Sequence, residues 1–203
     1  MTDQFPALRE QDLDPTPLVQ FDRWFAEASG TIPLAEAAAL ATATADGRPS
    51  VRMVLVKGWD GQGLVFYTNY QSRKGMELAR NSWAALLFHW QQLGRQVRLE
   101  GPVQPVSAAE SDRYFASRPR NSQLGAVASA QSRTVTSREE LDQRVSQLQQ
   151  SLEGKPVTRP IWWGGYRLHP TSYEFWQHRE DRLHDRIRYL REGSGWRIDR
   201  LQP

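Results

Sequence analysis

Residues 46–68 read DGRPSVRMVLVKGWDGQGLVFYT and contain two candidate β-strands, each preceded by a candidate turn. Asp46-Gly47 is a common hairpin turn pair, and the apolar run 51–57 follows it. A second glycine-rich turn, 58–63, leads into a strand predicted at 64–68. Strands joined by such short turns run antiparallel. This stretch therefore predicts a pair of neighbouring antiparallel strands.

Further short strands are predicted on both sides of this pair. The runs 37–44, 84–90, 96–103, 166–168, 173–177, 187–190 and 196–198 have the composition and length of strands. Strands at this spacing, joined by short turns, favour an antiparallel sheet that closes or folds over as a barrel. The predicted fold class is mainly β, with helices added.

Four helices are predicted around these strands. Apolar residues recur at helical spacing between positions 18 and 25, and residues 72–80 form a second short candidate helix. Capping boxes, SAAE at 107–110 and SREE at 137–140, open two more. Pro119 must end the first of these near residue 118, because proline cannot continue a helix. Residues 154–160 read as a linker.

The composition is that of an ordinary soluble globular protein. With 203 residues, of which 39% are apolar and 24% charged, the chain suits one domain over residues 1–203, with residues 1–16 as a flexible arm. The longest apolar runs are too short to span a bilayer and no signal peptide is recognisable, so we expect a cytoplasmic protein without membrane contact. A net charge of +3 does not indicate a nucleic-acid partner.

Several kinds of site are excluded or disfavoured. The chain has no cysteine and therefore no disulfide, thiolate nucleophile or zinc-thiolate centre. The glycines at 58, 61 and 63 do not follow the dinucleotide-binding pattern, and no Walker A loop is present. The four histidines show no HExxH or other metal spacing, so we expect no metal site.

Two basic regions are candidates for binding anions. Arg52 and Lys57 are five residues apart, so they point to opposite faces of a regular strand. They are either strand-end charges in water or partners of two different anions. Arg73 and Lys74 follow Ser72 at the expected start of a helix, where free N–H groups favour an anion and disfavour cations. This segment is either a solvated basic turn or a phosphate site.

Two further groups of residues are candidates for binding a substrate. Tyr114 and Arg118 share one helix face, and Pro119 could turn Ser122 back toward them, which would suit a phosphate monoester. In RLHDR, residues 182–186, an extended backbone would place Arg182, His184 and Arg186 on one face, with Asp185 on the other. The repulsion among these cations would be reduced by a ligand that is anionic or electron-rich. Scattered counter-ions of the protein would reduce it as well. Asp185 is interpreted as a structural counter-ion.

Ten motifs occur together in an order that resembles a known family. They are RMVLVKG (52–58), VFYTN (65–69), SRKG (72–75), RQVRLEG (95–101), YFxSRPxxSQxGA (114–126), QS (131–132), WGGY (163–166), EFWQ (174–177), RLHDR (182–186) and WxIDRL (196–201). Across residues 18–203 the chain resembles the pyridoxamine/pyridoxine 5′-phosphate oxidase family. The resemblance implies an FMN-binding split β-barrel that works as a homodimer with flavin at the subunit interface.

The resemblance also implies roles for individual residues. It implies FMN contacts from Arg52, Lys57, Tyr67, Thr68, Arg73, Lys74, Gln96, Gln131, Ser132, Trp176 and Arg186, some of them across the dimer. It implies a clamp on the substrate 5′-phosphate from Lys57, Tyr114, Arg118 and Ser122, and catalytic positions over the pyridine ring for Arg182 and His184. The implied reaction is oxidation of pyridoxamine or pyridoxine 5′-phosphate to pyridoxal 5′-phosphate, with O₂ as acceptor and H₂O₂ released.

The chain departs from the family pattern in two places. His178-Arg179 follows EFWQ where the family commonly has glycine, and the N-terminal Arg-x-x-Tyr segment that covers the substrate is not recognisable. Alternatives left open are another split-barrel flavin enzyme, such as an oxidase of phenazine precursors or a flavin reductase, and a non-catalytic flavin- or pyridoxal-phosphate-binding protein. The phosphate clamp distinguishes the first reading from these, because a substrate without phosphate does not need it.

Overall fold

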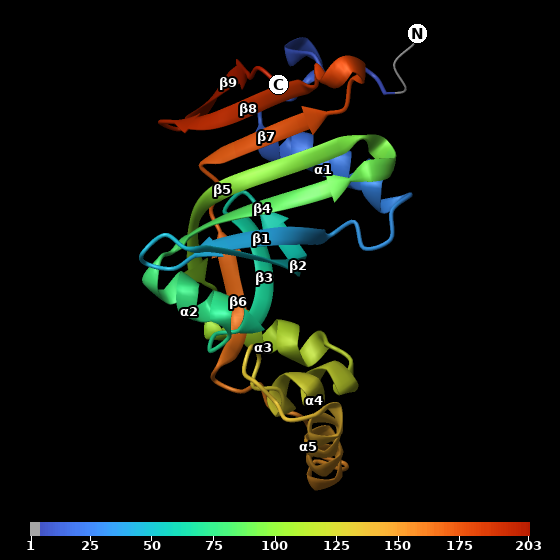
Figure 1. The fold of residues 1–203 in the computed structure, drawn as a ribbon, viewed down its shortest axis with the longest axis vertical. Coiled ribbons are helices and arrows are strands. Elements are labelled where there is room, and N and C mark those ends of the chain that lie inside the picture. Colours follow the sequence, from blue (N-terminus) through green and yellow to red (C-terminus); the bar gives the residue numbers. More distant parts are fainter. Residues whose placement is uncertain (1–4) are drawn as a thin grey trace.

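A computed structural model describes residues 5–203 (Figure 1). Its strands are β1 (Ala37–Ala43), β2 (Pro49–Asp60), β3 (Gly63–Asn69), β4 (Trp83–Trp90), β5 (Arg95–Pro105), β6 (Trp163–Leu168), β7 (Ser172–Gln177), β8 (Asp185–Glu192) and β9 (Gly195–Arg200). Its helices are α1 (Pro17–Ser29), α2 (Arg73–Arg80), α3 (Ala108–Ser117), α4 (Arg120–Ala128) and α5 (Arg138–Ser151), with short 3-10 turns at Glu10–Asp12, Gln91–Leu93 and Glu180–Arg182.

The strands form one antiparallel barrel with an extension. Pairing runs β4-β1-β2-β3-β6-β5, and β4 also pairs with β5, which closes a ring of six strands. The strand β5 is long enough to use one edge twice: its residues 95–100 pair with β7 and its residues 103–105 pair with β6. From β7 the sheet continues through β8 to β9 (Figure 1). The predicted mainly β, barrel-forming fold class is confirmed.

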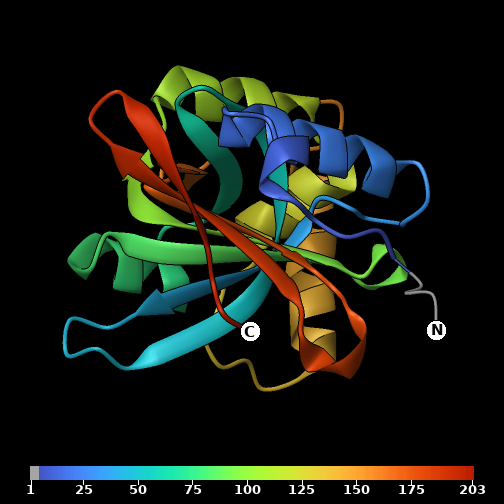
Figure 2. The same ribbon diagram turned by 90° about the horizontal axis from the view of Figure 1, so that it is seen from above.

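The main hydrophobic core lies between the barrel strands and α1, which runs along one side of them (Figure 2). Phe21 of α1 is fully buried, with its ring centroid 5.1 Å from that of Phe88 on β4. Trp24 meets Phe175 of β7 edge-to-face at 5.2 Å. The N-terminal helix thus packs against a strand formed some 150 residues later, which ties the two ends of the chain into one core.

The predicted opposition of Arg52 and Lys57 on β2 is confirmed. Arg52 points to the same side as the buried Val56, whereas Lys57 lies on the outer side. That outer side also carries Val51, Met53 and Leu55, whose exposed fractions are 70%, 63% and 39%. An alternating strand with an apolar outer face is unusual in water unless another surface covers it.

A smaller core lies under the helices α3, α4 and α5 at one end of the barrel (Figure 1). Ser107 and Ser137 cap α3 and α5 by accepting hydrogen bonds from the backbone N–H groups of Glu110 and Glu140, so both predicted helix starts are confirmed. The helix α4 was not predicted. It begins directly after Pro119, and its Leu124 is 1% exposed in the smaller core.

The N-terminal segment from residue 5 onward lies against the end of the sheet. The backbone N–H of Leu8 donates to Asp185, and Arg200 pairs with Glu10. Leu8 itself is 8% exposed and belongs to the main core. These contacts join part of the predicted arm to the end of the sheet. Residues 1–4 of the predicted arm lie outside the described residues.

Candidate active site

A cationic cluster lies at the N-terminus of α2. Ser72 caps the helix, and Gly75 in its first turn lets the carbonyl of Tyr70 approach; a Cβ at position 75 would stand 2.1 Å from that oxygen. The guanidinium groups of Arg52 and Arg73 both reach Glu77, at 3.2 and 2.9 Å. The local fold therefore gathers Arg52, Arg73 and the start of α2 around one carboxylate.

Glu77 is the counter-ion of this cluster. It is 5% exposed and also accepts hydrogen bonds from Thr42 and Ser50. Burial opposes its ionisation, but the bonds from Ser50, Thr42, Arg73 and Arg52 outweigh it and lower the pKa of the carboxyl to about 2. Sequence reasoning missed Glu77, although its i+4 spacing from Arg73 was an available signal.

Lys74 is the third cation and lies deepest. It is 8% exposed and donates to Thr68 at 3.1 Å and to Gln131 at 2.9 Å, while Thr68 also donates to Gln131. Burial, with repulsion from Arg52 as a smaller cause, lowers the pKa of Lys74 to about 8. Three cations therefore lie near one carboxylate at a helix N-terminus, an arrangement that favours an anion.

A second cationic site is built on aromatic rings at the helical end of the barrel. The ring of Tyr67 on β3 stacks on Tyr114 of α3 at 3.8 Å, and both are nearly parallel to Trp163 of β6. The guanidinium of Arg118 lies over Trp163 at 4.7 Å. Burial lowers the pKa of Arg118 and raises that of Tyr67 to about 12.

The Nη1 atom of Arg118 is buried without a hydrogen-bond partner among the described residues. A buried, unpaired guanidinium nitrogen is costly, and an anion bound beside it would satisfy it. Two other members of the predicted clamp have partners elsewhere. Ser122 lies on α4, where its backbone N–H donates to the carbonyl of Pro119 at 2.8 Å, and Lys57 pairs with Glu36 at 3.0 Å.

A third group forms a row across β5, β7 and β8. Gln96 lies opposite Trp176, and Trp176 lies opposite Arg186, so the three side chains share the sheet face away from the main core. Arg186 is held by the buried Glu174 at 2.7 Å, and hydrogen bonding to that carboxylate raises the pKa of the guanidinium. Glu174, like Trp163 and Glu77, was not among the predicted site residues.

The RLHDR segment does not have the extended shape assumed from the sequence. Asp181 and Arg182 have left-handed backbone conformations, with φ of 56° and 63°, and β8 begins only at Asp185. The expectation that Arg182, His184 and Arg186 share one strand face is therefore wrong for Arg182, which projects from an exposed turn. Residues with positive φ are hard to foresee when they are not glycine or asparagine.

His184 and Asp185 have clear partners in this turn. The ring of His184 lies 4.5 Å from that of Trp176, and its Nδ1 accepts the backbone N–H of Arg179. Burial, and then repulsion from His178 and Arg182, lowers the pKa of His184. Asp185 binds Arg200 at 2.7 Å and the N–H of Leu8 at 3.0 Å, which confirms it as a structural counter-ion.

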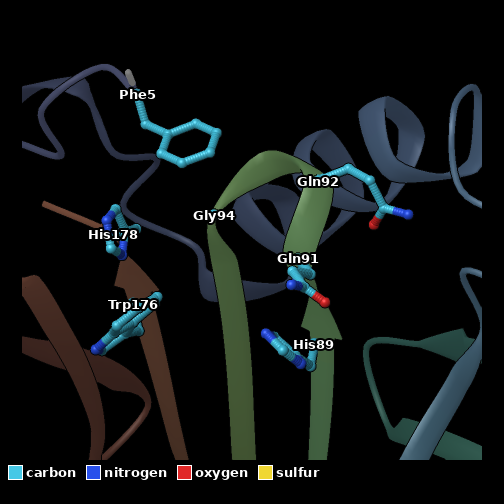
Figure 3. A pocket seen from close by; sticks show the side chains of 7 residues that line it. All are labelled: Phe5, His89, Gln91, Gln92, Gly94, Trp176 and His178. Atoms are coloured by element: carbon cyan, nitrogen blue, oxygen red, sulfur yellow. The ribbon is translucent and has the colours of Figure 1, made fainter. Parts of the chain in front are cut away.

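A pocket of about 640 Å³ opens beside this row (Figure 3). It is lined by Phe5, His89, Gln91, Gln92, Gly94, Trp176 and His178. Phe5 and His178 lie together on one wall, and His89 and Gln91 face them across the opening (Figure 3). The pocket is mixed in character, with aromatic walls and several hydrogen-bonding groups, as is usual for small-molecule sites.

The three groups do not meet within one chain. Among the described residues, no hydrogen bond, ion pair or ring contact joins the cationic cluster, the Arg118 site and the Gln96–Trp176–Arg186 row. The helices α2 and α3 lie toward one end of the molecule and β7 and β8 at the other (Figure 1). Ser132, with a φ of 70°, is exposed and stands next to Gln131 of the cationic cluster.

No group of three or more potential ligands for a metal ion is found in residues 5–203, and no helix described there is long and apolar enough to cross a membrane.

Comparison with known proteins agrees with this architecture. The profile described as pyridoxamine 5′-phosphate oxidase matches residues 26–152, and the profile described as pyridoxine 5′-phosphate oxidase C-terminal dimerisation region matches residues 163–203. Proteins named pyridoxine/pyridoxamine 5′-phosphate oxidase from Rubrobacter xylanophilus and Cupriavidus taiwanensis are each 57% identical, over 97% of this chain and 91% and 93% of theirs.

Two solved structures share the fold. One is PhzG from Burkholderia lata in complex with tetrahydrophenazine-1-carboxylic acid, with a TM-score of 0.91 and 36% identity over 98% of this chain and 99% of that one. The other is a pyridoxamine 5′-phosphate oxidase-related, FMN-binding protein from Nostoc punctiforme, with a TM-score of 0.73 over 93% and 98% of the two chains. At 15% identity the second shows the fold alone.

The closed six-strand barrel, in which β5 pairs with both β6 and β7, has the fold of FMN-binding split-barrel proteins. Its matches extend over nearly the whole length of the chain. The chain belongs to the pyridoxamine 5′-phosphate oxidase family.

Proposed function

We propose that the protein oxidises pyridoxamine 5′-phosphate, pyridoxine 5′-phosphate or both to pyridoxal 5′-phosphate, using bound FMN, with O₂ as acceptor and H₂O₂ as product. The observation that carries this proposal is the presence of two separate cationic sites. One is the Arg52, Arg73 and Lys74 cluster, and the other is Arg118 with its unpartnered nitrogen. Two phosphate groups, one on the cofactor and one on the substrate, account for both.

The residues of the first site fit the phosphate of FMN. A phosphate dianion would balance the excess of cations over Glu77 and would accept hydrogen bonds from Lys74 and Thr68. The residues assigned to FMN binding are Arg52, Lys57, Tyr67, Thr68, Arg73, Lys74, Gln96, Gln131, Ser132, Trp176 and Arg186. The polar row on β5, β7 and β8 supplies the members that could hydrogen-bond the flavin ring and stack on it.

The second site fits the substrate phosphate. Arg118 would donate its free Nη1 proton to a phosphate oxygen, and the stacked Tyr114 places a hydroxyl near the same end of α3. Ser122 and Lys57 complete the assigned clamp. For Lys57 this requires that its pair with Glu36 opens or is shared, because the ammonium is bonded to that carboxylate at 3.0 Å.

FMN, when bound, would supply the two-electron redox chemistry between the substrate and O₂. The protein orients the reacting groups. His184, with a lowered pKa and with Nδ1 accepting from the backbone, is neutral at neutral pH and presents its Nε2 proton. Arg182 projects from the adjacent turn toward open space, where it could lie over a bound pyridine ring. With the amine substrate, water releases ammonia as the aldehyde forms.

A second copy of the chain would bring the separated groups together. The exposed apolar face of β2, formed by Val51, Met53 and Leu55, and the dimerisation region at 163–203 support a homodimer. Arg52 and Lys57 lie on that same strand. We place the FMN site at this interface, so that β2 and α2 of one protomer face β7 and β8 of its partner.

The resemblance to PhzG favours a second candidate function, the oxidation of a reduced phenazine carboxylate. Such a substrate has a carboxylate but no phosphate, so the buried Arg118 site would be less well filled. One turnover experiment with different substrates distinguishes the two candidate functions.

Purified protein loaded with FMN should convert pyridoxamine 5′-phosphate in air to an aldehyde and release equal amounts of peroxide and ammonia. Pyridoxamine without phosphate should react at least about a hundredfold less efficiently, because the clamp makes charge-assisted bonds only to the ester. Equal turnover of the two amines would remove the basis of the proposal. Turnover of a reduced phenazine carboxylate alone would support the second candidate.

A further inference from the structure

A chain of aromatic rings links the RLHDR turn to the N-terminal segment. His184 lies 4.5 Å from Trp176 and 5.2 Å from His178, and His178 in turn meets Phe5 edge-to-face at 5.8 Å. His178 is therefore the one ring that contacts His184, Trp176 and Phe5 together in this cluster. It stands where β7 ends and the turn toward β8 begins.

The backbone around His178 is tightly placed. Its N–H donates to the carbonyl of Gly94 at 2.7 Å, and Gly94 has a left-handed φ of 59°. A Cβ at position 94 would stand 2.6 Å from the ring of Phe5 and 3.0 Å from Cβ of His178. Phe5 and His178 thus occupy the space that a side chain at position 94 would need.

Phe5 is itself held from the other side of the turn. The guanidinium of Arg179 donates to the carbonyl of Phe5 at 3.0 Å, and the backbone N–H of Arg179 donates to Nδ1 of His184. The residues His178 and Arg179 therefore bind Phe5 and His184 at the same time. A substitution of His178 should therefore alter the positions of both Phe5 and His184.

We propose that His178 is a positioning residue for the oxidation: it holds the imidazole of His184 against Trp176 and fixes Phe5 over the pocket beside them. The inference rests on the proposed function and adds a residue to it. His178 does not touch the reacting atoms in this account; it acts through His184. Through Phe5, it also makes the N-terminal segment part of the wall of the pocket.

The charges that face His184 come from three places. His178 lies at the end of β7 and Arg182 in the turn, and both disfavour a proton on His184. The guanidinium of Arg179 is directed to Phe5 and toward Asp185. The carboxylate of Asp185 is occupied by Arg200 and the N–H of Leu8.

The test measures the pKa of His184 by NMR in the FMN-loaded protein without substrate. The chain has only four histidines, so the ring signals can be assigned by substitution. His178→Gln removes the ring and keeps a side chain of similar length, and we expect the pKa of His184 to rise. His178→Gly also admits water, and the rise should be larger. His169→Gln, a histidine outside the pocket, is the control and should change nothing.

Kinetics provide the second readout. His178→Gly should lower kcat about tenfold or more with FMN retained, because a misplaced His184 affects the reacting geometry rather than cofactor binding. His178→Gln should recover part of the loss, and the acidic limb of its kcat/KM profile should move with the NMR pKa. An unchanged pKa and an unchanged profile in both variants would overturn the inference. Absence of turnover in the parent protein would refute the proposed function but leave the NMR test of His178 intact.

Discussion

Raising the pH from 7 to 9 should weaken the binding of FMN about tenfold, because Lys74 loses its proton in this interval. The pKa of its buried ammonium is about 8 instead of the usual 10.5. About nine-tenths of the free protein therefore carries a charged Lys74 at pH 7, and about one-tenth at pH 9. The phosphate of FMN is a dianion throughout, since its second pKa is about 6.

The sign follows from linkage. Bound phosphate favours the charged ammonium and raises its pKa, so FMN binds the protonated protein more tightly. Affinity is then highest below pH 8 and falls as the pH rises through the pKa of the free protein. Depression of this pKa from 10.5 to about 8 corresponds to a cost of about 3 kcal/mol for charging Lys74 in the free protein, part of which the phosphate offsets.

The assay is a titration of flavin fluorescence at pH 7, 8 and 9 and constant ionic strength. Lys74→Met is the matched variant: it should bind FMN about 10- to 100-fold more weakly at pH 7 and show no such pH dependence. Riboflavin, which lacks the phosphate, should bind the parent protein equally at the three pH values. Equal pH slopes for the parent protein and the variant, or for FMN and riboflavin, would refute this account of Lys74.

Three further substitutions have specific expected outcomes. Arg118→Met should raise KM for the phosphorylated amine about a hundredfold with FMN affinity unchanged, because only the substrate loses a charge-assisted bond. An equally large loss of FMN affinity in an equilibrium titration would contradict the assignment of Arg118 to the substrate phosphate. Met53→Asp should weaken the dimer at least about a hundredfold in analytical ultracentrifugation, because the substitution occurs twice in a symmetric interface. A dimer that persists would exclude the outer face of β2 as that interface. Asp185→Asn should lower the free energy of unfolding by about 1–3 kcal/mol in a urea titration, since Arg200 and the N–H of Leu8 lose a charged acceptor, and unchanged stability would show that those bonds contribute little.

The strands were largely predictable because their signals are local. Glycine turns and alternation between 46 and 68 correctly indicated the hairpin of β2 and β3 and the opposite faces of Arg52 and Lys57. Serine caps likewise marked the first turns of α3 and α5. These features depend on neighbours within a few residues, which a sequence displays directly.

What the sequence could not show depends on distant partners. The helix α4 has a weak apolar pattern and is stabilised by packing Leu124 into the smaller core, so propensity alone does not reveal it. Asp181 and Arg182 have left-handed conformations although neither is glycine, so the sequence gives no signal for them. The counter-ion Glu174 became visible only when the fold brought it to Arg186. The roles assigned to individual site residues stay predictions until ligands are bound.

The double use of β5 also has a consequence for how the chain folds during synthesis. Its residues 95–100 have no partner on one edge until β7 emerges, and Trp24 of α1 lacks the ring of Phe175 until the same moment. Both ends of the chain must be made before the main core is complete, so contacts of long sequence separation dominate assembly. The nascent protein therefore has an open β5 edge while residues 106–171 are synthesised, and such an edge can pair with other chains until β7 covers it.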